Sequence, residues 1–226
     1  MTISHGVPCY FHPAESPELW ARLAQRADVV RFAVVNPHNG PGMVEDPSYV
    51  GVVQDLHRAG IRAIGYIDTA YGERGLADVL DEATLYRDRY GLRGVFLDQG
   101  ATSLALVSVY ERYLLRLRGA GMRFVVLNPG AFPHPAYVDL VNVTVTFEGH
   151  WRDYRRLTVP AWTLKKPASR FCHFVYDVPP AIAQNPSECV IARHAQTACL
   201  TQGTLPNPWD RLPAALEGQP TSVARP

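Results

Sequence analysis

The sequence lacks the features that mark several classes of protein. Its 22 lysine and arginine residues are balanced by 21 aspartate and glutamate residues, which gives a formal net charge of +1. Because no basic excess is available to grip a phosphate backbone, we expect no nucleic-acid partner. The longest apolar runs are strand-sized and broken by polar residues, so we expect no membrane span. No signal peptide is visible at the start, and the chain as written would stay in the cytoplasm.

Metal and cofactor motifs are also missing. The four cysteines form no CxxC pair, and no HExxH, P-loop, GxSxG or helical histidine spacing occurs, so we expect no cofactor and no metal. A divalent metal held by carboxylates from different strands is an alternative that spacing leaves open. Cys9 and Cys172 lie in apolar runs and are expected to be buried free thiols. A disulfide would require a secreted protein.

Apolar runs recur along the chain and are mostly continuous, which is typical of strands covered on both faces. Amphipathic helical patterns separate several of them, at 16–26, 47–59, 75–90 and 104–119. This alternation predicts βα units and a parallel sheet. The expected strands are 7–11, 29–35, 61–67, 94–97, 123–127, 140–147, 171–176 and a weak one near 198–201.

A short polar residue stands at the end of six of these runs. The set is Asn36, Asp68, Asp98, Asn128, Glu148 and Asp177. Their spacing is close to one βα unit of about thirty residues, except for the short step from Asn128 to Glu148. We therefore predict the α/β class and a compact single (β/α)8 TIM-type barrel with one reduced βα unit. The barrel domain would span residues 1–213 and a C-terminal tail 214–226. A doubly wound open sheet is the alternative, although no GxGxxG follows the first strand.

Residues at the carboxyl ends of barrel strands meet at one mouth and tend to be catalytic or ligand-binding. The competing interpretation is that Asp and Asn only cap turns there, which applies to Asp68 in particular. Asp98 and Glu148 each follow an aromatic-rich apolar run, where a carboxyl group tends to have a raised pKa. Such a pair suits hydrolysis of a glycosidic bond, with one carboxyl as acid and the other as base or nucleophile.

Carbohydrate sites also need flat aromatic faces and hydrogen-bonding groups near the carboxylates. The loop 36–42, rich in glycine and proline, is expected to line the mouth beside Tyr66, Tyr71 and Arg74. Core packing competes with binding for Tyr176 and Trp151, and a salt bridge competes for Arg74. The candidate substrate-binding residues are Gln99, Tyr10, His12, Asn36, Asn39, Tyr66, Asp68, Tyr71, Arg74, Asn128, Trp151 and Tyr176.

Several segments together are similar to a known family. They are Pro8–Pro13, Val35–Gly42, Ala59–Arg74, Gly94–Asp98, Leu127–Gly130, Thr146–Gly149, Asn207–Asp210 and Leu212-Pro213. This combination spans nearly the whole chain and resembles the spherulation-specific (spherulin-4-like) family, related to glycoside hydrolase family 135.

The resemblance implies a (β/α)8 glycoside hydrolase acting on an amino-sugar polysaccharide or oligosaccharide. Characterised relatives cleave α-1,4-linked N-acetylgalactosamine in galactosamine-rich exopolysaccharides in an endo fashion, and relatives are commonly secreted. The family's acidic residues are an Asp-Glu pair after the fourth strand and a Glu after the sixth. Asp98 and Glu148 match, but Gln99 replaces the second acid of the pair and cannot ionise. The alternative function is therefore a catalytically impaired carbohydrate-binding barrel.

Overall fold

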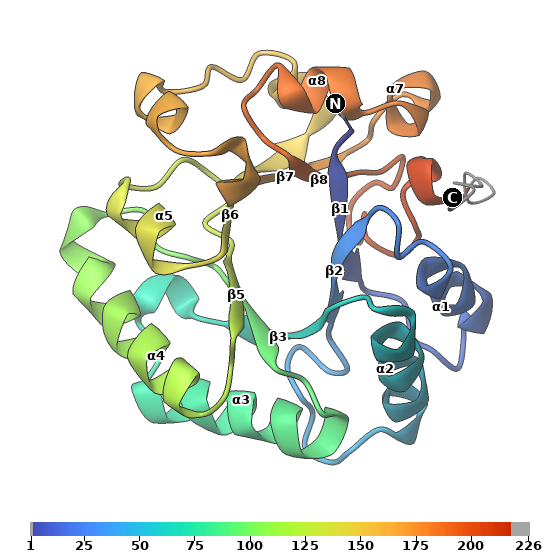
Figure 1. Ribbon diagram of the computed structural model, residues 1–226, viewed down its shortest axis with the longest axis vertical. Helices are drawn as coiled ribbons and strands as arrows, with labels where there is room; N and C mark the ends of the chain where they lie inside the picture. The colour runs from blue at the N-terminus through green and yellow to red at the C-terminus, as the bar shows by residue number, and fades with distance from the viewer. Residues whose placement is uncertain (1, 218–226) are drawn as a thin grey trace, which may run out of the picture.

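Eight parallel strands close into a barrel in chain order in the computed structural model, which describes residues 2–217 (Figure 1). The barrel closes where Ser4 and His5 of the first strand pair with Thr197 and Ala198 of the last. The predicted barrel is confirmed, and the open sheet is excluded. The strands are β1 (Ser4–Cys9), β2 (Val30–Val35), β3 (Ala63–Asp68), β4 (Gly94–Asp98), β5 (Phe124–Leu127), β6 (Val143–His150), β7 (Phe171–Tyr176) and β8 (Thr197–Leu200).

Long helices cover the first half of the barrel. They are α1 (Pro17–Ala24), α2 (Pro47–Ala59), α3 (Leu76–Tyr90) and α4 (Val107–Gly119), with short 3-10 turns η1 (Ala70–Gly72) and η2 (Leu104–Leu106). The local sequence fixes their ends, as α2 illustrates. The side chain of Asp46 accepts a hydrogen bond from the Ser48 N–H at 2.9 Å, and Gly60 ends the helix at a φ of 87°.

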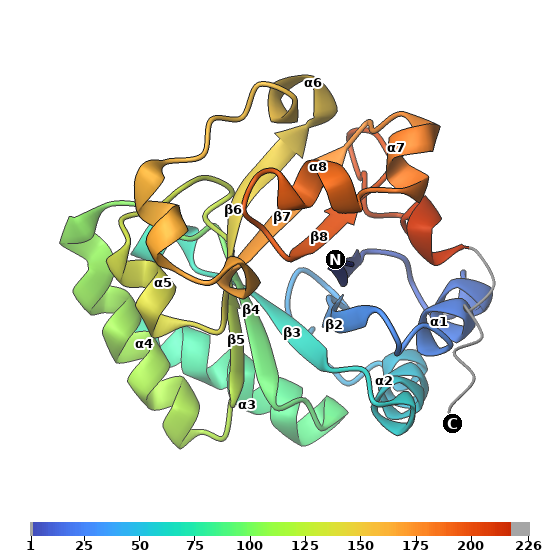
Figure 2. The same cartoon turned by 45° about the horizontal axis from the view of Figure 1, so that its top comes forward.

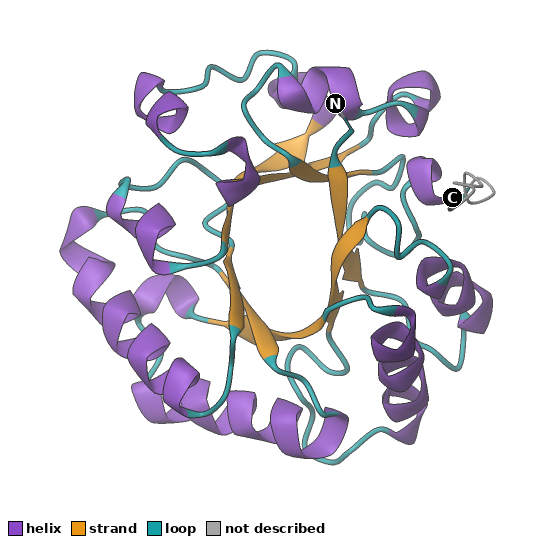
Figure 3. Ribbon diagram, viewed as in Figure 1, coloured by secondary structure: helices purple, strands orange, loops and turns teal. Residues whose placement is uncertain are grey.

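The second half of the barrel is covered by shorter pieces, as Figure 3 shows. The predicted reduced unit contains the five-residue helix α5 after β5. The reduction continues after β6 and β7, where prolines such as Pro160, Pro167, Pro179 and Pro186 interrupt any longer helix. These pieces are α5 (Ala136–Leu140), α6 (Trp151–Tyr154), η3 (Ala161–Lys165), η4 (Ala168–Arg170), α7 (Pro180–Gln184), α8 (Ser187–Ile191) and η5 (Ala214–Leu216).

The barrel interior is filled by large side chains, so it is a packed core and not a pore. Phe32, Phe96 and Phe174 are buried inside it together with aliphatic residues of the other strands. Gly6 faces this interior from β1, and a Cβ there would lie 2.3 Å from the ring of Phe32. A glycine on β1 therefore makes the room that Phe32 needs.

A β-bulge in β6 changes which of its residues face the interior. Val145 pairs with Cys172 of β7, but Phe147 pairs with the very next residue, His173, so Thr146 is an extra residue. Before the bulge Val145 faces the inner core, whereas after it Phe147 packs in the outer layer. Glu148 consequently lies opposite Phe174, an inner-core residue. The bulge thus directs Glu148 into the barrel, at the end of β6 that runs into α6 in Figure 2.

The structure also shows the state of two cysteines, the position of the C-terminal segment and the character of the helices. Cys9 and Cys172 are buried free thiols, as predicted. Leu216, in the segment assigned by sequence to the tail, is buried against the core, and residues 218–226 of that predicted tail lie outside the described residues. Within residues 2–217, no helix combines the length and apolarity needed to cross a bilayer.

Candidate active site

One asparagine side chain connects the two predicted catalytic carboxylates. Asp98 ends β4, Asn128 directly follows β5, and Glu148 lies in β6. The Asn128 Nδ2 group donates to Asp98 Oδ1 at 2.7 Å and to Glu148 Oε2 at 2.5 Å. The N–H of Gly130 donates to Asn128 Oδ1 at 3.0 Å, which fixes the direction of the amide. Two oxygens that share one nitrogen in this way lie at most about 5 Å apart.

The two carboxyl groups differ in protonation. Burial, followed by the nearby Asp98 carboxylate, raises the pKa of Glu148 to about 7, against the opposing hydrogen bonds from Asn128 and Trp209. Burial also raises the pKa of Asp98, while hydrogen bonds from Tyr66 and Asn128 favour its charged form. Near neutral pH Glu148 is therefore partly protonated, so it can give up or take up a proton beside Asp98, as acid–base chemistry needs.

Two tyrosines border this pair. The hydroxyl of Tyr66 donates to Asp98 Oδ2 at 2.8 Å, and the ring of Tyr10 packs edge-on against Tyr66 with a centroid distance of 6.0 Å. Burial and the Asp98 carboxylate raise the pKa of both hydroxyls, so they stay protonated as hydrogen-bond donors. Both residues thus lie beside the carboxylate pair.

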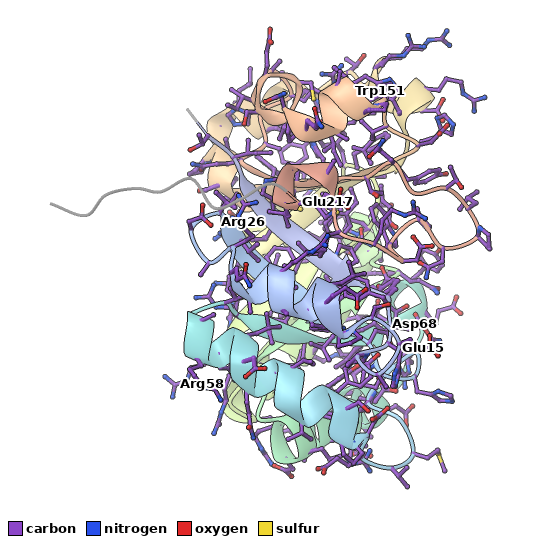
Figure 4. The ribbon with its side chains drawn as sticks, turned by 90° about the vertical axis from the view of Figure 1, so that its right-hand side faces the viewer. Glu15, Arg26, Arg58, Asp68, Trp151 and Glu217 are labelled. Atoms are coloured by element: carbon purple, nitrogen blue, oxygen red, sulfur yellow. The ribbon has the colours of Figure 1, made fainter. Side chains whose placement is uncertain are left out.

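Gln99 and Asp68 form a second polar pair beside the first. Gln99 follows Asp98 directly, with a left-handed φ of 47°, and its Nε2 donates to Asp68 Oδ2 at 3.0 Å. The other oxygen of Asp68 accepts from the Ala70 N–H at 2.7 Å. Asp68 therefore caps the turn after β3, as its alternative interpretation holds, and also holds the side chain of Gln99. Figure 4 shows Asp68 at the end of the barrel that also carries Glu15 and Trp151.

The loops after β2 and β3 are tied to the barrel at several points. Arg74 donates to the Asp68 carbonyl at 2.9 Å and forms an ion pair with Glu82 at 2.5 Å, so its guanidinium is occupied by protein groups. Tyr71 leaves 59% of its side chain exposed and has a φ of 56°. In the loop 36–42, the side chain of Asn36 accepts from the Gly40 N–H at 2.9 Å, while Asn39 is exposed.

A cavity of about 490 Å³ opens beside Tyr10. His12 and Asn36 line it, together with Asn207 and Asp210 from the segment after β8. His12 is held by Asp46, at 2.8 Å between Nε2 and Oδ2. His12 and Asn36, the first residue of the predicted loop 36–42, therefore line the same cavity as Tyr10.

Trp151 and Tyr176 occupy different surroundings. Trp151 lines a separate cavity of about 520 Å³, which also contains a contact of 2.6 Å between His150 Nε2 and Asp177 Oδ2. Tyr176 packs against the inner core and lies edge-on to Trp209, at 6.5 Å between ring centroids. The structure therefore places Tyr176 against the inner core beside Trp209, and Trp151 at the start of α6, directly after β6.

Trp209 is the site residue that sequence analysis missed. It is buried, packs on Phe174, and its side chain lies near enough to Glu148 to oppose the rise in the pKa of that carboxyl group. The motif Asn207-Pro208-Trp209-Asp210 can be recognised in the sequence, but it follows the last strand. No polar residue at the end of that strand indicated that the motif lies near the mouth. Among residues 2–217, no three His, Cys, Asp or Glu side chains gather in an arrangement that would hold a metal ion.

Comparison with known proteins now adds to this geometry. A family model described as Spherulation-specific family 4 matches residues 6–222. The chain belongs to that family. Spherulin-4 of Physarum polycephalum is 32% identical over 145 residues, which cover 63% of this chain and 43% of that protein. The match therefore spans less than half the length of that curated relative.

Solved structures share the fold of this spherulation-specific family 4 member. Aspergillus clavatus Sph3, crystallised in complex with GalNAc, superimposes with a TM-score of 0.78 at 22% identity, covering 95% of this chain and 94% of that one. A chitinase from Rhizomucor miehei gives a TM-score of 0.56 at 12% identity, over 96% of this chain and 100% of that one. The GH113 β-mannanase of Alicyclobacillus acidocaldarius gives 0.53 at 13% identity, over 96% and 91%. At these identities the likeness is one of fold.

Proposed function

We propose that the protein is a glycoside hydrolase that cleaves an amino-sugar polysaccharide or oligosaccharide within the chain. The observation that carries the proposal is the pair of carboxyl groups on Asn128, whose bonded oxygens lie no more than about 5 Å apart, one group with its pKa raised to about 7. A polymer of N-acetylgalactosamine best suits family membership, because the solved Sph3 structure contains GalNAc, and the resemblance to the family implies the α-1,4 linkage.

In the proposed reaction Glu148 is the general acid. Its proton passes to the glycosidic oxygen as the C1–O bond breaks, and the leaving sugar departs as an alcohol. Asp98 either attacks C1 itself or orients the 2-acetamido group, whose carbonyl oxygen then attacks C1. Water next attacks C1 from the vacated side and returns a proton to Glu148. The bonded oxygens lie closer together than the roughly 6.5–9.5 Å typical of inverting enzymes, so we expect the anomeric configuration to be retained.

The surrounding groups support this assignment. The hydroxyl of Tyr66 and the amide of Asn128 both donate to Asp98 and stabilise its ionised form. Tyr10 and the exposed Tyr71 offer flat faces on which a sugar ring can lie. Asn36 lines the cavity beside Tyr10, and its side-chain NH2 group would donate a hydrogen bond to a sugar hydroxyl. The ring nitrogens of His12 in the same cavity are held by Asp46 and by the Ala14 N–H, so His12 would shape the cavity.

A second candidate function rests on Gln99. Its side chain is neutral and donates to Asp68, where the family resemblance implies an ionisable Glu. A barrel whose chemistry needs that acid would bind the polysaccharide without cleaving it. This second function keeps the same ligand but removes turnover.

The deciding experiment measures turnover and binding on one protein sample. Defined α-1,4-linked N-acetylgalactosamine oligosaccharides are incubated with the protein, and products are followed by mass spectrometry and by NMR of the new reducing end. Shorter oligosaccharides with the α configuration formed first support the proposal. Binding in calorimetry without any product supports the second candidate, and neither binding nor product contradicts both.

A further inference from the structure

The opposite end of the barrel carries arginines in a repeating position. Arg62, Arg93 and Arg123 each stand just before a strand, β3, β4 and β5 in turn, and Arg31 lies at the start of β2. Backbone bonds place them side by side. The Arg62 carbonyl accepts from the Ala33 N–H at 2.9 Å, and the Arg93 carbonyl accepts from the Arg123 N–H at 2.7 Å. Neighbouring strands thus deliver a row of guanidinium groups to one rim.

Arg62, Arg93 and Arg123 line a pocket of about 570 Å³, in which their guanidinium N–H groups are the main polar groups. Its other lining residues include Phe124, His57 and Asn142. The Asn142 Oδ1 accepts from the Val125 N–H at 2.8 Å, which turns the amide's NH2 group away from that bond. Burial lowers the pKa of His57, so its ring is neutral near pH 7. None of the described residues that line this pocket is acidic.

The arginines of the rim have no carboxylate to balance them. Within residues 2–217, none of Arg31, Arg62, Arg93 and Arg123 forms an ion pair. The hydrogen bond from Arg87 and, to a smaller extent, the charge of Arg93 lower the pKa of Asp88. The Asp88 carboxylate pairs with Arg87 at 2.7 Å and not with Arg93. Burial and the charges of Arg62 and Arg170 lower the pKa of Arg31. A cluster of like charges that repel one another is stabilised by a bound anion.

Part of the cluster is held in place before any anion arrives. The Arg62 guanidinium lies 4.4 Å from the centre of the Phe124 ring and donates to the Arg31 carbonyl at 3.4 Å. Phe124 packs in turn on Phe32 of the inner core, at 6.0 Å between ring centroids. A planar guanidinium fixed in this way still presents free N–H groups and suits bidentate contact with phosphate oxygens.

We propose that this rim is a binding site for a diphosphate group, remote from the carboxylate mouth. Three neighbouring strands about 4.8 Å apart spread Arg62, Arg93 and Arg123 over roughly 10 Å, which is wider than one phosphate group can bridge with bidentate contacts. Two linked phosphates match that width and the cationic lining, in which none of the described residues is acidic. Figure 4 shows Arg58 of α2 and Arg26 toward this end of the barrel, opposite Asp68 and Trp151.

The test is calorimetry of the full chain with inorganic pyrophosphate, orthophosphate and sulfate at matched ionic strength. We expect pyrophosphate to bind at least about tenfold more tightly than the other two, because only it reaches several arginines at once. ADP and UDP form further arms. Tighter binding of either than of pyrophosphate assigns the diphosphate to a nucleotide, and equal or weaker binding assigns it to the inorganic ion.

Single substitutions locate the site. Arg93→Gln and Arg62→Gln should each weaken pyrophosphate binding by about tenfold, and Arg93→Lys should fall between Arg93→Gln and the native protein. Arg156→Gln, an exposed arginine after α6, is the matched control and should bind like the native chain. Equal binding of all three anions, no binding at millimolar concentration, or unchanged binding in both rim variants would overturn the proposal. None of these readouts depends on carbohydrate hydrolysis.

Discussion

The two ends of the barrel hold their charges in opposite ways. At the carboxyl end, Asp98 and Glu148 are largely shielded from solvent and share the donor Asn128. At the amino end, Arg62 and Arg93 are exposed on an open pocket without carboxylate partners. Shielding a charge changes its pKa and costs stability, whereas an exposed charge keeps its ionisation and attracts counter-ions. Substitutions at the carboxyl end should therefore alter chemistry and stability, and those at the amino end should alter little besides anion binding.

The largest effect is expected from removing either carboxyl group. Asp98→Asn and Glu148→Gln should each lower the rate of oligosaccharide hydrolysis by about 10²–10⁴-fold, because an acid–base group is lost while its shape is kept. Initial rates and circular dichroism of the purified variants test this. Asp153→Asn, which changes an exposed carboxylate on α6, should stay within about twofold of the native rate. Full activity in both carboxyl variants would refute the assignment.

The same substitution at Glu148 should stabilise the fold at alkaline pH. The folded protein keeps a proton on Glu148 between about pH 4.5 and pH 7 that the unfolded chain releases, so stability falls as the pH rises through that range. Glu148→Gln removes this titration and should raise the free energy of unfolding at pH 8 by up to about 3 kcal/mol. The gain should shrink below pH 5. Urea unfolding at both pH values measures it, and a gain independent of pH would contradict the raised pKa.

Restoring an acid at position 99 tests the neighbouring pair. In Gln99→Glu a second carboxyl group would lie about as near to Asp68 as the present 3.0 Å contact, so the two would share a proton and one pKa would rise. If Gln99 is a weakened catalytic position, the hydrolysis rate should stay equal or increase. Rates of Gln99→Glu and the isosteric control Gln99→Met separate ionisation from shape. A fall of about tenfold or more in Gln99→Glu would contradict this prediction.

The smallest effect on the hydrolase is expected at the amino end. Arg93→Gln should leave the hydrolysis rate within about twofold and the free energy of unfolding within about 0.5 kcal/mol, because its side chain is exposed and forms no ion pair. Initial rates and urea unfolding at low and high salt check this. A marked loss of hydrolysis would show that the two ends are coupled and would break the contrast between them.

Sequence alone predicted the barrel because strand ends repeat, and each of the six polar residues lies within two positions of an observed strand end. It also placed Asp98, Asn128 and Glu148 at one mouth. It did not reveal the partners of those residues, since Trp209 approaches Glu148 only through tertiary packing after β8. The arginine rim was overlooked for a related reason. The pattern of polar strand ends indicates residues that follow strands and gives no signal for residues that precede them.

The bulge at Thr146 makes the orientation of Glu148 depend on how β6 pairs with β7. If Thr146 instead took a regular place in the ladder, plain alternation along β6 would turn the Glu148 carboxyl toward the outer helices. Every site residue would still be present in such a chain, and the motif Phe-Glu-Gly would still be legible in it. Loss of function in relatives can therefore arise from a change in strand pairing alone, where a search for altered residue identities would find nothing changed.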